Sequence, residues 1–92
     1  MTLLIKEILK LKPKNQLVVV EGWVKNFRAN KFVSLNDGST ILNIQCVIDY
    51  ENFDESIIKK INTGTSLSIR GKLVKSLGSG QEAEILVENI KI

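Results

Sequence analysis

The stretch from Gly22 to Val47 contains three kinds of side chain that could contact a nucleobase. Phe32 offers an aromatic plane, and stacking a base on such a plane stabilises binding by about 1–3 kcal/mol. Gln45 offers an amide donor and a carbonyl acceptor for the edge of a base. Arg28 carries a guanidinium group, which can contact a phosphate or stack on a base. Together these groups favour binding of a single-stranded nucleic acid.

Two further basic residues, Lys25 and Lys31, lie close to Arg28 in the sequence and would add salt-sensitive attraction to a phosphate backbone. The net charge is +3 and is unevenly distributed: residues 1–31 hold seven Lys/Arg and two Glu, whereas residues 32–64 hold two Lys and five acids. This segregation suits an RNA partner. The alternative for each lysine is a solvated loop.

Other kinds of chemistry find little support in the composition. The chain has no histidine and a single cysteine, Cys46, which excludes an internal disulfide, a Cys/His metal cluster and histidine-based catalysis. The acids have no convergent spacing, so we predict no catalytic residue and no metal site. The longest apolar run is Leu17 to Val20, which predicts a cytoplasmic chain without a membrane span or signal peptide.

The 92 residues predict a single domain, residues 1–92, with one modest core. Apolar side chains recur at helical spacing from Leu3 to Leu11, which predicts a helix with Thr2 as its N-cap inside a helical extension, residues 1–14. A second helix is predicted from Asn52 to Asn62, where acids precede an isoleucine stripe and lysines follow.

Alternation of apolar and polar residues predicts five strands. They are expected at Gln16–Arg28, Lys31–Asn36 and Ile41–Asp49, then around Leu67–Leu73 and around Ala83–Val87. Gly22 predicts a bulge or sharp bend in the first strand. Ile90 falls out of phase with the last strand, which predicts a break near Asn89, and Gly78-Ser79-Gly80 predicts a flexible loop before that strand.

The second and third strands are expected to form a hairpin, because residues 37–40 read Asp-Gly-Ser-Thr, an aspartate–glycine turn signal. A four-residue turn pairs Asn36 with Ile41 and sets Phe32 opposite Gln45 on the outer face. The apolar pairs that this register brings together in the core are Leu35 with Leu42 and Val33 with Ile44.

The predicted order is helix, three strands, helix, two strands. An all-β barrel of five strands with a helix between the third and fourth is typical of the oligonucleotide/oligosaccharide-binding (OB) fold, which binds ligands on the face of its second and third strands.

Several candidates also have a purely structural interpretation. Phe32 could pack under a loop, and outward glutamates such as Glu84 commonly serve solubility. A carboxylate at that position could also accept hydrogen bonds from a guanine edge. Trp23 could serve as a stacking platform, but it is expected to pack beneath the N-terminal helix, and Cys46 is expected in the core.

The chain resembles the N-terminal anticodon-binding domain of class IIb aminoacyl-tRNA synthetases in the segments GWVKNFRANKFVSLNDGS, LNIQCVID, SIRGKLVKSLGSGQEAEI and VENIKI. The sequences LNDGST at residues 35–40 and GSGQ at residues 78–81 are most similar to the asparaginyl branch of this family. The resemblance covers nearly the whole chain from Leu17 onward. It implies an OB-fold module that binds tRNA.

The resemblance also implies roles for individual residues. The family phenylalanine stacks on the middle anticodon base, a uridine, and matches Phe32; the glutamine that reads the edge of this base matches Gln45. The family arginine matches Arg28, and the glutamate associated with the first anticodon base matches Glu84. The loop between the first and second predicted strands, near Lys25 and Lys31, is shorter here than in the aspartyl enzymes of the family.

For partners, the resemblance implies the anticodon stem-loop of asparagine tRNA and a catalytic domain in the same polypeptide, within a homodimeric asparagine–tRNA ligase. ATP and magnesium would belong to that catalytic domain, whose signature motifs these residues do not contain. The domain itself would need no cofactor and catalyse nothing.

Two other interpretations of the sequence remain open. The first is a general single-strand-binding OB barrel, which would be indifferent to base sequence. The second is a protein-interaction barrel that docks on a catalytic subunit through the same strand face.

Overall fold

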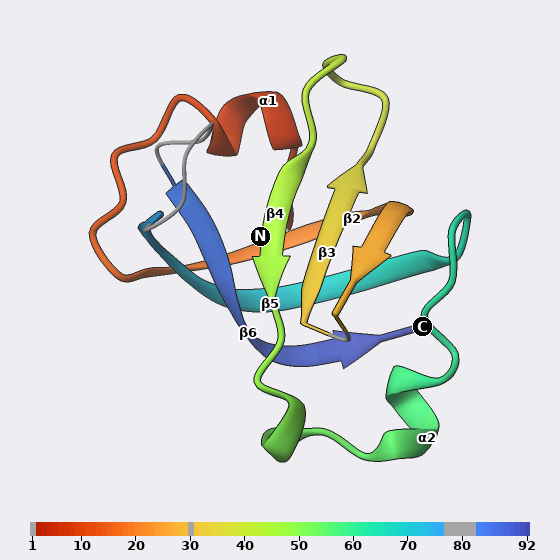
Figure 1. Cartoon of the computed structure of the whole chain (residues 1–92). Helices are drawn as coiled ribbons and strands as arrows, with labels where there is room; N and C mark the ends of the chain where they lie inside the picture. Colours follow the sequence, from red (N-terminus) through yellow and green to blue (C-terminus); the bar gives the residue numbers. More distant parts are fainter. Residues whose placement is uncertain (1, 30, 77–82) are drawn as a thin grey trace.

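The computed structural model describes residues 2–29, 31–76 and 83–92 (Figure 1). Its elements in chain order are β1 (Thr2–Leu3), α1 (Ile5–Ile8), β2 (Gln16–Arg28), β3 (Phe32–Asn36), β4 (Ile44–Val47), the 3-10 helix η1 (Tyr50–Asn52), α2 (Glu55–Ile58), β5 (Ser66–Lys75) and β6 (Ala83–Lys91). Within the described ranges, no helix is long and apolar enough to cross a membrane. The predicted loop at Gly78-Ser79-Gly80 lies outside the described residues.

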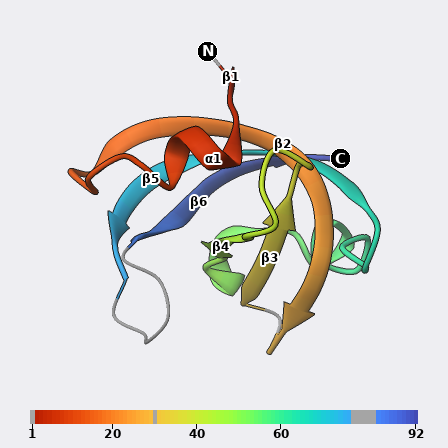
Figure 2. The ribbon, with the colours of Figure 1, turned by 90° about the horizontal axis from the view of Figure 1, so that it is seen from above.

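The strands form one sheet that closes into a barrel. Neighbouring strands follow the order β1, β2, β3, β4, β6, β5, and β5 also pairs with β2. β2 makes both connections because it curves through a long arc (Figure 2): its first half pairs with β5 and its second half with β3. The predicted five-stranded OB barrel is therefore confirmed, with the two-residue β1 as an addition at its edge.

Alternate side chains of the strands fill the barrel. Val18, Val20 and Val24 of β2 are buried, as their shared side predicted. Cys46 is also fully buried, which confirms its core role, and burial raises the pKa of its thiol to about 12. The helical regions, which lie at opposite ends of the barrel in Figure 1, add further buried side chains, namely Ile5, Ile8, Ile58 and Ile61.

The N-terminal helix is shorter than the predicted Leu3–Leu11, and Thr2 is not its N-cap. Thr2 and Leu3 instead pair with β2 as a strand, and α1 begins only after Leu4. The backbone N–H of Ile5 donates to Oδ2 of Asp37 at 2.9 Å, so the helix start is capped by a residue distant in sequence. The spacing of apolar residues between Leu3 and Leu11 therefore indicates which side chains are buried, and it does not give the length of the helix.

The predicted helix Asn52–Asn62 is also interrupted. The Asp49 side chain accepts a hydrogen bond from the backbone N–H of Glu51 at 3.2 Å, which starts the separate turn η1. Phe53 then takes an extended backbone and packs partly buried against the core, and α2 begins after Asp54. Tertiary packing of Phe53 breaks the helix, although Ile58 and Ile61 of the isoleucine stripe still lie in the core.

The β3–β4 hairpin is confirmed, but its predicted register is wrong by two residues. Leu35 pairs with Ile44 instead of Leu42, and Leu42 is exposed in a longer connection. Val33 accordingly faces Cys46, and Phe32 faces Val47 rather than Gln45, which pairs with Ser34. Because the error is an even number of residues, the residues that pair between β3 and β4 keep their predicted faces, whereas Leu42, predicted in the core, does not.

A buried amide explains the longer connection. Nδ2 of Asn36 donates to the carbonyl oxygens of Thr40 and Leu42, each at 3.1 Å, and to Oδ1 of Asn43 at 2.9 Å. Its Oδ1 accepts from the backbone N–H of Gly38 at 2.7 Å. The Asn36 amide thus supplies hydrogen-bond partners to the backbone of the loop, which can therefore be longer than a four-residue turn.

Gly22 does not form the predicted bulge. The irregularity in β2 falls between Val24 and Asn26, which leaves Lys25 as the extra residue. Gly22 is needed for a different reason, because a Cβ at this position would collide with the backbone carbonyl oxygen of Asn36.

The predicted break in the last strand is confirmed. Gly71 of β5 pairs with Val87 of β6, and the preceding Arg70 pairs with Asn89. Glu88 therefore has no partner in β5 and forms a bulge. This bulge returns Ile90 to a position opposite the buried Ile69.

Candidate nucleic-acid interface

The outer side of the barrel carries a row of side chains centred on Phe32. Arg28 at the end of β2 pairs with Phe32, which pairs with Val47 of β4. Val47 pairs with Leu86 of β6, and Leu86 pairs with Lys72 of β5. Residues directly opposite in a sheet share a face. The aromatic ring is therefore bordered by a cation on one side and by apolar surface on the other.

A second row lies directly beside the first. Ser34 of β3 stands opposite both Asn26 of β2 and Gln45 of β4. Gln45 is thus a diagonal neighbour of Phe32, at roughly 7–8 Å between Cα atoms in such a pairing. The predicted shared face is correct, whereas their direct opposition is wrong.

The second row ends in a polar contact. Nε2 of Gln45 donates to Oε1 of Glu84 at 3.4 Å, between β4 and β6. Both side chains are half-buried. We call the outer surface formed by Arg28, Phe32, Ser34, Gln45 and Glu84 the Phe32 face.

The two lysines among the candidates differ in position. Lys31 follows the tight turn after β2 and places its Nζ 5.5 Å from the centroid of the Phe32 ring. Its backbone N–H donates to the carbonyl oxygen of Arg28 at 3.0 Å, which holds the turn closed. Lys25 is the extra residue of the β2 bulge and is opposite no residue of β3. Five of the six candidates therefore come together, and Lys25 stands apart.

A hollow of about 840 Å³ opens next to the Phe32 face. Its lining includes Lys31, Val47, Lys72 and Leu86, and the Leu86 side chain is 43% exposed. A volume of this size is within the range of ligand sites. Apolar side chains of β4 and β6 and the two lysines share this lining with three acids, Asp49, Glu51 and Glu88, so the hollow is mixed in charge.

Sequence reasoning missed Ser34, Asn26 and Leu86 as members or neighbours of this surface. Ser34 could have been found, because it is two residues from Phe32 and must share its face. Leu86 carried no such signal, since a single outward leucine is common.

The turn signal after β3 proves to be structural. Oδ1 of Asp37 accepts hydrogen bonds from the backbone N–H of Ser39 at 2.9 Å and from its hydroxyl at 2.6 Å, while Oδ2 caps α1. Desolvation raises the pKa of Asp37, but hydrogen bonds from Ser39 and Ile5 outweigh it and lower the pKa below its usual 3.8. These residues tie the loop to α1.

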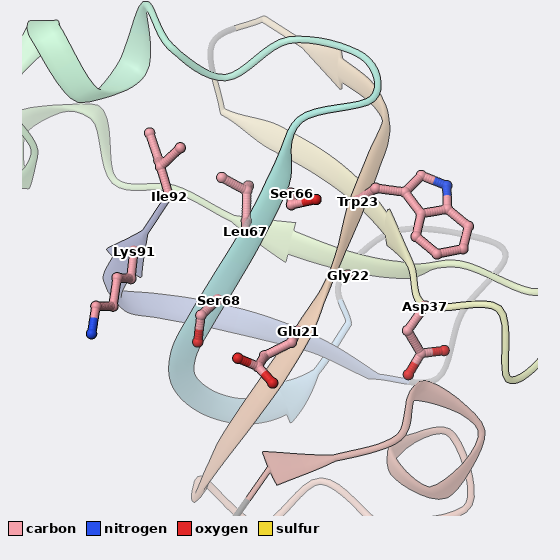
Figure 3. Close-up of a pocket in the computed structure, with 9 residues that line it drawn as sticks. All are labelled: Glu21, Gly22, Trp23, Asp37, Ser66, Leu67, Ser68, Lys91 and Ile92. Atoms are coloured by element: carbon pink, nitrogen blue, oxygen red, sulfur yellow. The ribbon is translucent and has the colours of Figure 1, made fainter.

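Trp23 does not pack beneath the N-terminal helix, and its predicted core role is wrong. Its side chain is 38% exposed and leans along the outside of β2 toward Gly38 (Figure 3). It borders a trough of about 560 Å³ whose lining includes Ser66 and Ser68 of β5. This trough shares no residue with the Phe32 face.

Comparison with known proteins places this geometry in a family. The sequence model of the tRNA_anti-codon family, described as an OB-fold nucleic acid binding domain, matches residues 18–92. An asparagine–tRNA ligase of Phocaeicola vulgatus is 45% identical over 91 residues, and one of Bacteroides fragilis is 44% identical over 91 residues. Each alignment covers 96% of this chain, and the chain spans only 20% of each relative.

A solved structure shows the same fold. The asparaginyl-tRNA synthetase of Pyrococcus horikoshii complexed with asparaginyl-adenylate superposes with a TM-score of 0.81 at 20% identity, covering 100% of this chain and 22% of that one. The family model and the relatives confirm the resemblance noted in the sequence, and the solved structure confirms the fold. The chain belongs to the tRNA_anti-codon family of OB-fold nucleic acid binding domains.

Proposed function

We propose that this chain is the anticodon-binding domain of an asparagine–tRNA ligase and binds the anticodon loop of asparagine tRNA on the Phe32 face. The observation that carries the proposal is the placement of an aromatic ring, an amide and a guanidinium group on adjoining strands, at Phe32, Gln45 and Arg28. The names of the relatives at 44–45% identity support the assignment to asparagine.

The proposed roles combine the chemistry of each group with the base positions that the family resemblance implies. Phe32 stacks on the middle base of the anticodon, and Gln45 hydrogen-bonds to its edge. Arg28 contacts a neighbouring phosphate or base, and Lys31 adds attraction to the backbone. Lys25 contributes long-range attraction, since it lies outside the cluster.

The rest of the ligase would perform the chemistry. This chain spans 20% of the relatives' length, so the ATP- and magnesium-dependent aminoacylating domain would lie in the remainder of the same polypeptide, in a cytoplasmic homodimer. Anticodon binding then contributes to catalysis by positioning the acceptor end of the tRNA.

The test is a titration of the domain with two RNA stem-loops, one with the natural asparagine anticodon and one whose middle uridine is cytidine. We expect tighter binding of the natural loop. Equal affinities would refute base recognition and favour a general single-strand binder. Footprinting of the protein with and without RNA tests the other alternative. If RNA does not protect residues 25–45, a protein-interaction barrel is favoured instead.

A further inference from the structure

Three lysines gather where β2 begins and β5 ends, at one rim of the barrel. Lys12 and Lys14 lie in the segment between α1 and β2, which runs beside the end of β5 (Figure 2). In this segment the backbone N–H of Asn15 donates to the carbonyl oxygen of Leu73 at 2.9 Å. Lys75 is the last residue of β5, two residues after Leu73, and therefore lies next to the segment. We call Lys12, Lys14 and Lys75 the lysine corner.

The backbone of this segment is held by the first side chain of β2. Oε1 of Gln16 accepts from the backbone N–H of Lys14 at 2.6 Å, and its Nε2 donates to the carbonyl oxygen of Lys12 at 2.8 Å. Pro13 restricts the backbone between the two lysines, and Asn15 takes a left-handed φ of 61°. The lysines therefore extend from a fixed backbone, which reduces the ordering cost of binding a partner.

The lysine corner presents charge without any group that could read a base. All three side chains are exposed, and no acid among the described residues forms an ion pair with them. The sequence from Lys10 to Leu17 contains no aromatic residue on which a base could stack. The amide of Gln16 is occupied by the backbone at both ends. These properties suit phosphate groups, which are bound without regard to base sequence.

The lysine corner lies at the same end of the sheet as the polar end of the Phe32 face. Glu84 of β6 pairs with Val74 of β5, the residue before Lys75. The strand order β4, β6, β5, β2 separates Gln45 on β4 from the start of β2 by three steps. Steps of about 4.8 Å amount to roughly 14 Å across the strands. An RNA that fills the Phe32 face and extends past Glu84 therefore meets the lysine corner with nucleotides outside the anticodon.

We propose that the lysine corner binds the phosphate backbone of the anticodon stem while the Phe32 face holds the loop. The inference rests on the proposed function and adds a contact that is independent of base sequence. The stem suits the lysine corner better than further loop nucleotides do, because two paired strands carry phosphates at a higher density than one strand. Contacts at both places fix the direction in which the stem leaves the domain, and thus orient the tRNA.

The experiment compares two RNAs that share the natural asparagine anticodon loop, namely a stem-loop and a linear RNA of the loop nucleotides alone. Binding constants are measured at several salt concentrations for the unaltered domain and for the double variant Lys12→Gln with Lys14→Gln. Each lost phosphate contact makes the slope of log binding constant against log salt concentration less steep by about 0.7–0.9. We expect the stem-loop slope to flatten by about 1.4–1.8 and the linear RNA slope to stay the same.

Lys6→Gln with Lys91→Gln is the matched control, because it removes the same charge from two exposed lysines on another side of the barrel. Lys91 lines the trough beside Trp23. The backbone N–H of Lys6 donates to Oγ of Ser39 at 3.1 Å, in the turn after β3 that borders the same trough. We expect this control to leave the stem-loop slope nearly unchanged.

Lys75→Gln is a second, independent variant, since Lys75 belongs to a different element. We expect it to flatten the stem-loop slope by about 0.7–0.9 and to leave the linear RNA slope the same. Thermal melting of each variant checks that the domain remains folded.

The outcomes separate the lysine corner from the proposed function. An unchanged stem-loop slope in the Lys12 and Lys14 double variant would overturn the contact. Equal flattening with both RNAs would overturn its assignment to the stem, and equal flattening by the control would reveal a general effect of charge and overturn it too. Exchange of the middle uridine for cytidine tests the Phe32 face separately, and the double variant should keep the preference of the unaltered domain. A domain without that preference would refute the proposed function, even where the stem contact is found.

Discussion

The ammonium group of Lys31 lies 5.5 Å from the centroid of the Phe32 ring, so the cation covers one side of the proposed stacking platform. An exposed contact of this kind contributes about 0.5–1 kcal/mol. Stacking of a base contributes about 1–3 kcal/mol, which is larger. A base that stacks on the covered side therefore displaces the lysine, which becomes available to a phosphate.

Substitution Lys31→Gln should weaken RNA binding most at low salt. The logarithm of the binding constant falls linearly with the logarithm of the salt concentration. Loss of one phosphate contact on a single strand should make this slope less steep by about 0.7. Titrations of the stem-loop at several salt concentrations measure this slope. Lys10→Gln, an equal charge change in an exposed residue after α1, is the control and should leave the slope nearly unchanged. Equal slopes for both variants would contradict a phosphate contact by Lys31.

Substitution Phe32→Ala should reduce binding of the stem-loop by about 1–3 kcal/mol with little effect on the melting temperature. Phe32 is only half-buried and does not belong to the core cluster. Phe27→Ala is the contrasting variant, because Phe27 packs partly buried against the core. It should cost about 1–3 kcal/mol of stability while its folded fraction binds RNA normally. A large drop in melting temperature for Phe32→Ala would favour a packing role instead.

The barrel could be predicted from the sequence because alternation reports which side chains face the core. Val18, Val20 and Val24 keep one face whatever the strand pairs with, and an error of two residues in the hairpin preserved the face of each residue that pairs between β3 and β4. The register itself could not be predicted, because it depends on four hydrogen bonds of the buried Asn36 amide. Alternation carries no information on such a loop.

The candidate site was predictable to the same extent. Parity placed Phe32 and Gln45 on one face, and these residues lie on neighbouring strands of a hairpin. The contact between Gln45 and Glu84 joins residues that are 39 positions apart, through a parallel pairing of β4 and β6. Only the closed barrel brings them together. The position of Trp23 was predicted wrongly. Its alternation with the buried Val24 indicates that its side chain lies on the outer face, but alternation does not show whether another element covers that face.

Substitution Asn36→Ala should destabilise the fold by about 1–3 kcal/mol, because it leaves the carbonyl oxygens of Thr40 and Leu42 without their donor. Urea unfolding followed by circular dichroism measures the change. Asn62→Ala is a suitable control, since Asn62 is exposed, and it should change stability by no more than about 0.5 kcal/mol. Similar losses in both variants would contradict the structural role of the buried amide.

Asp37 should make the fold sensitive to acid. Hydrogen bonds from Ser39 and Ile5 lower the pKa of Asp37 in the folded state despite the opposing effect of desolvation. The unfolded chain therefore takes up this proton at a higher pH than the folded domain does. The stabilising contribution of Asp37 is complete above the ordinary pKa of 3.8 and is lost as the pH falls through the lower pKa of the folded state.

The measurement is the free energy of unfolding in urea as a function of pH below 6. Asp37→Asn should lower stability at neutral pH and flatten the acid limb of the curve, because an asparagine has no proton to take up there. Asp54→Asn is the matched control, since the Asp54 side chain makes no cap hydrogen bond at α2. Its acid limb should follow that of the unaltered domain. An unchanged limb in Asp37→Asn would mean that the contacts between this carboxylate, Ser39 and α1 do not hold the loop in solution.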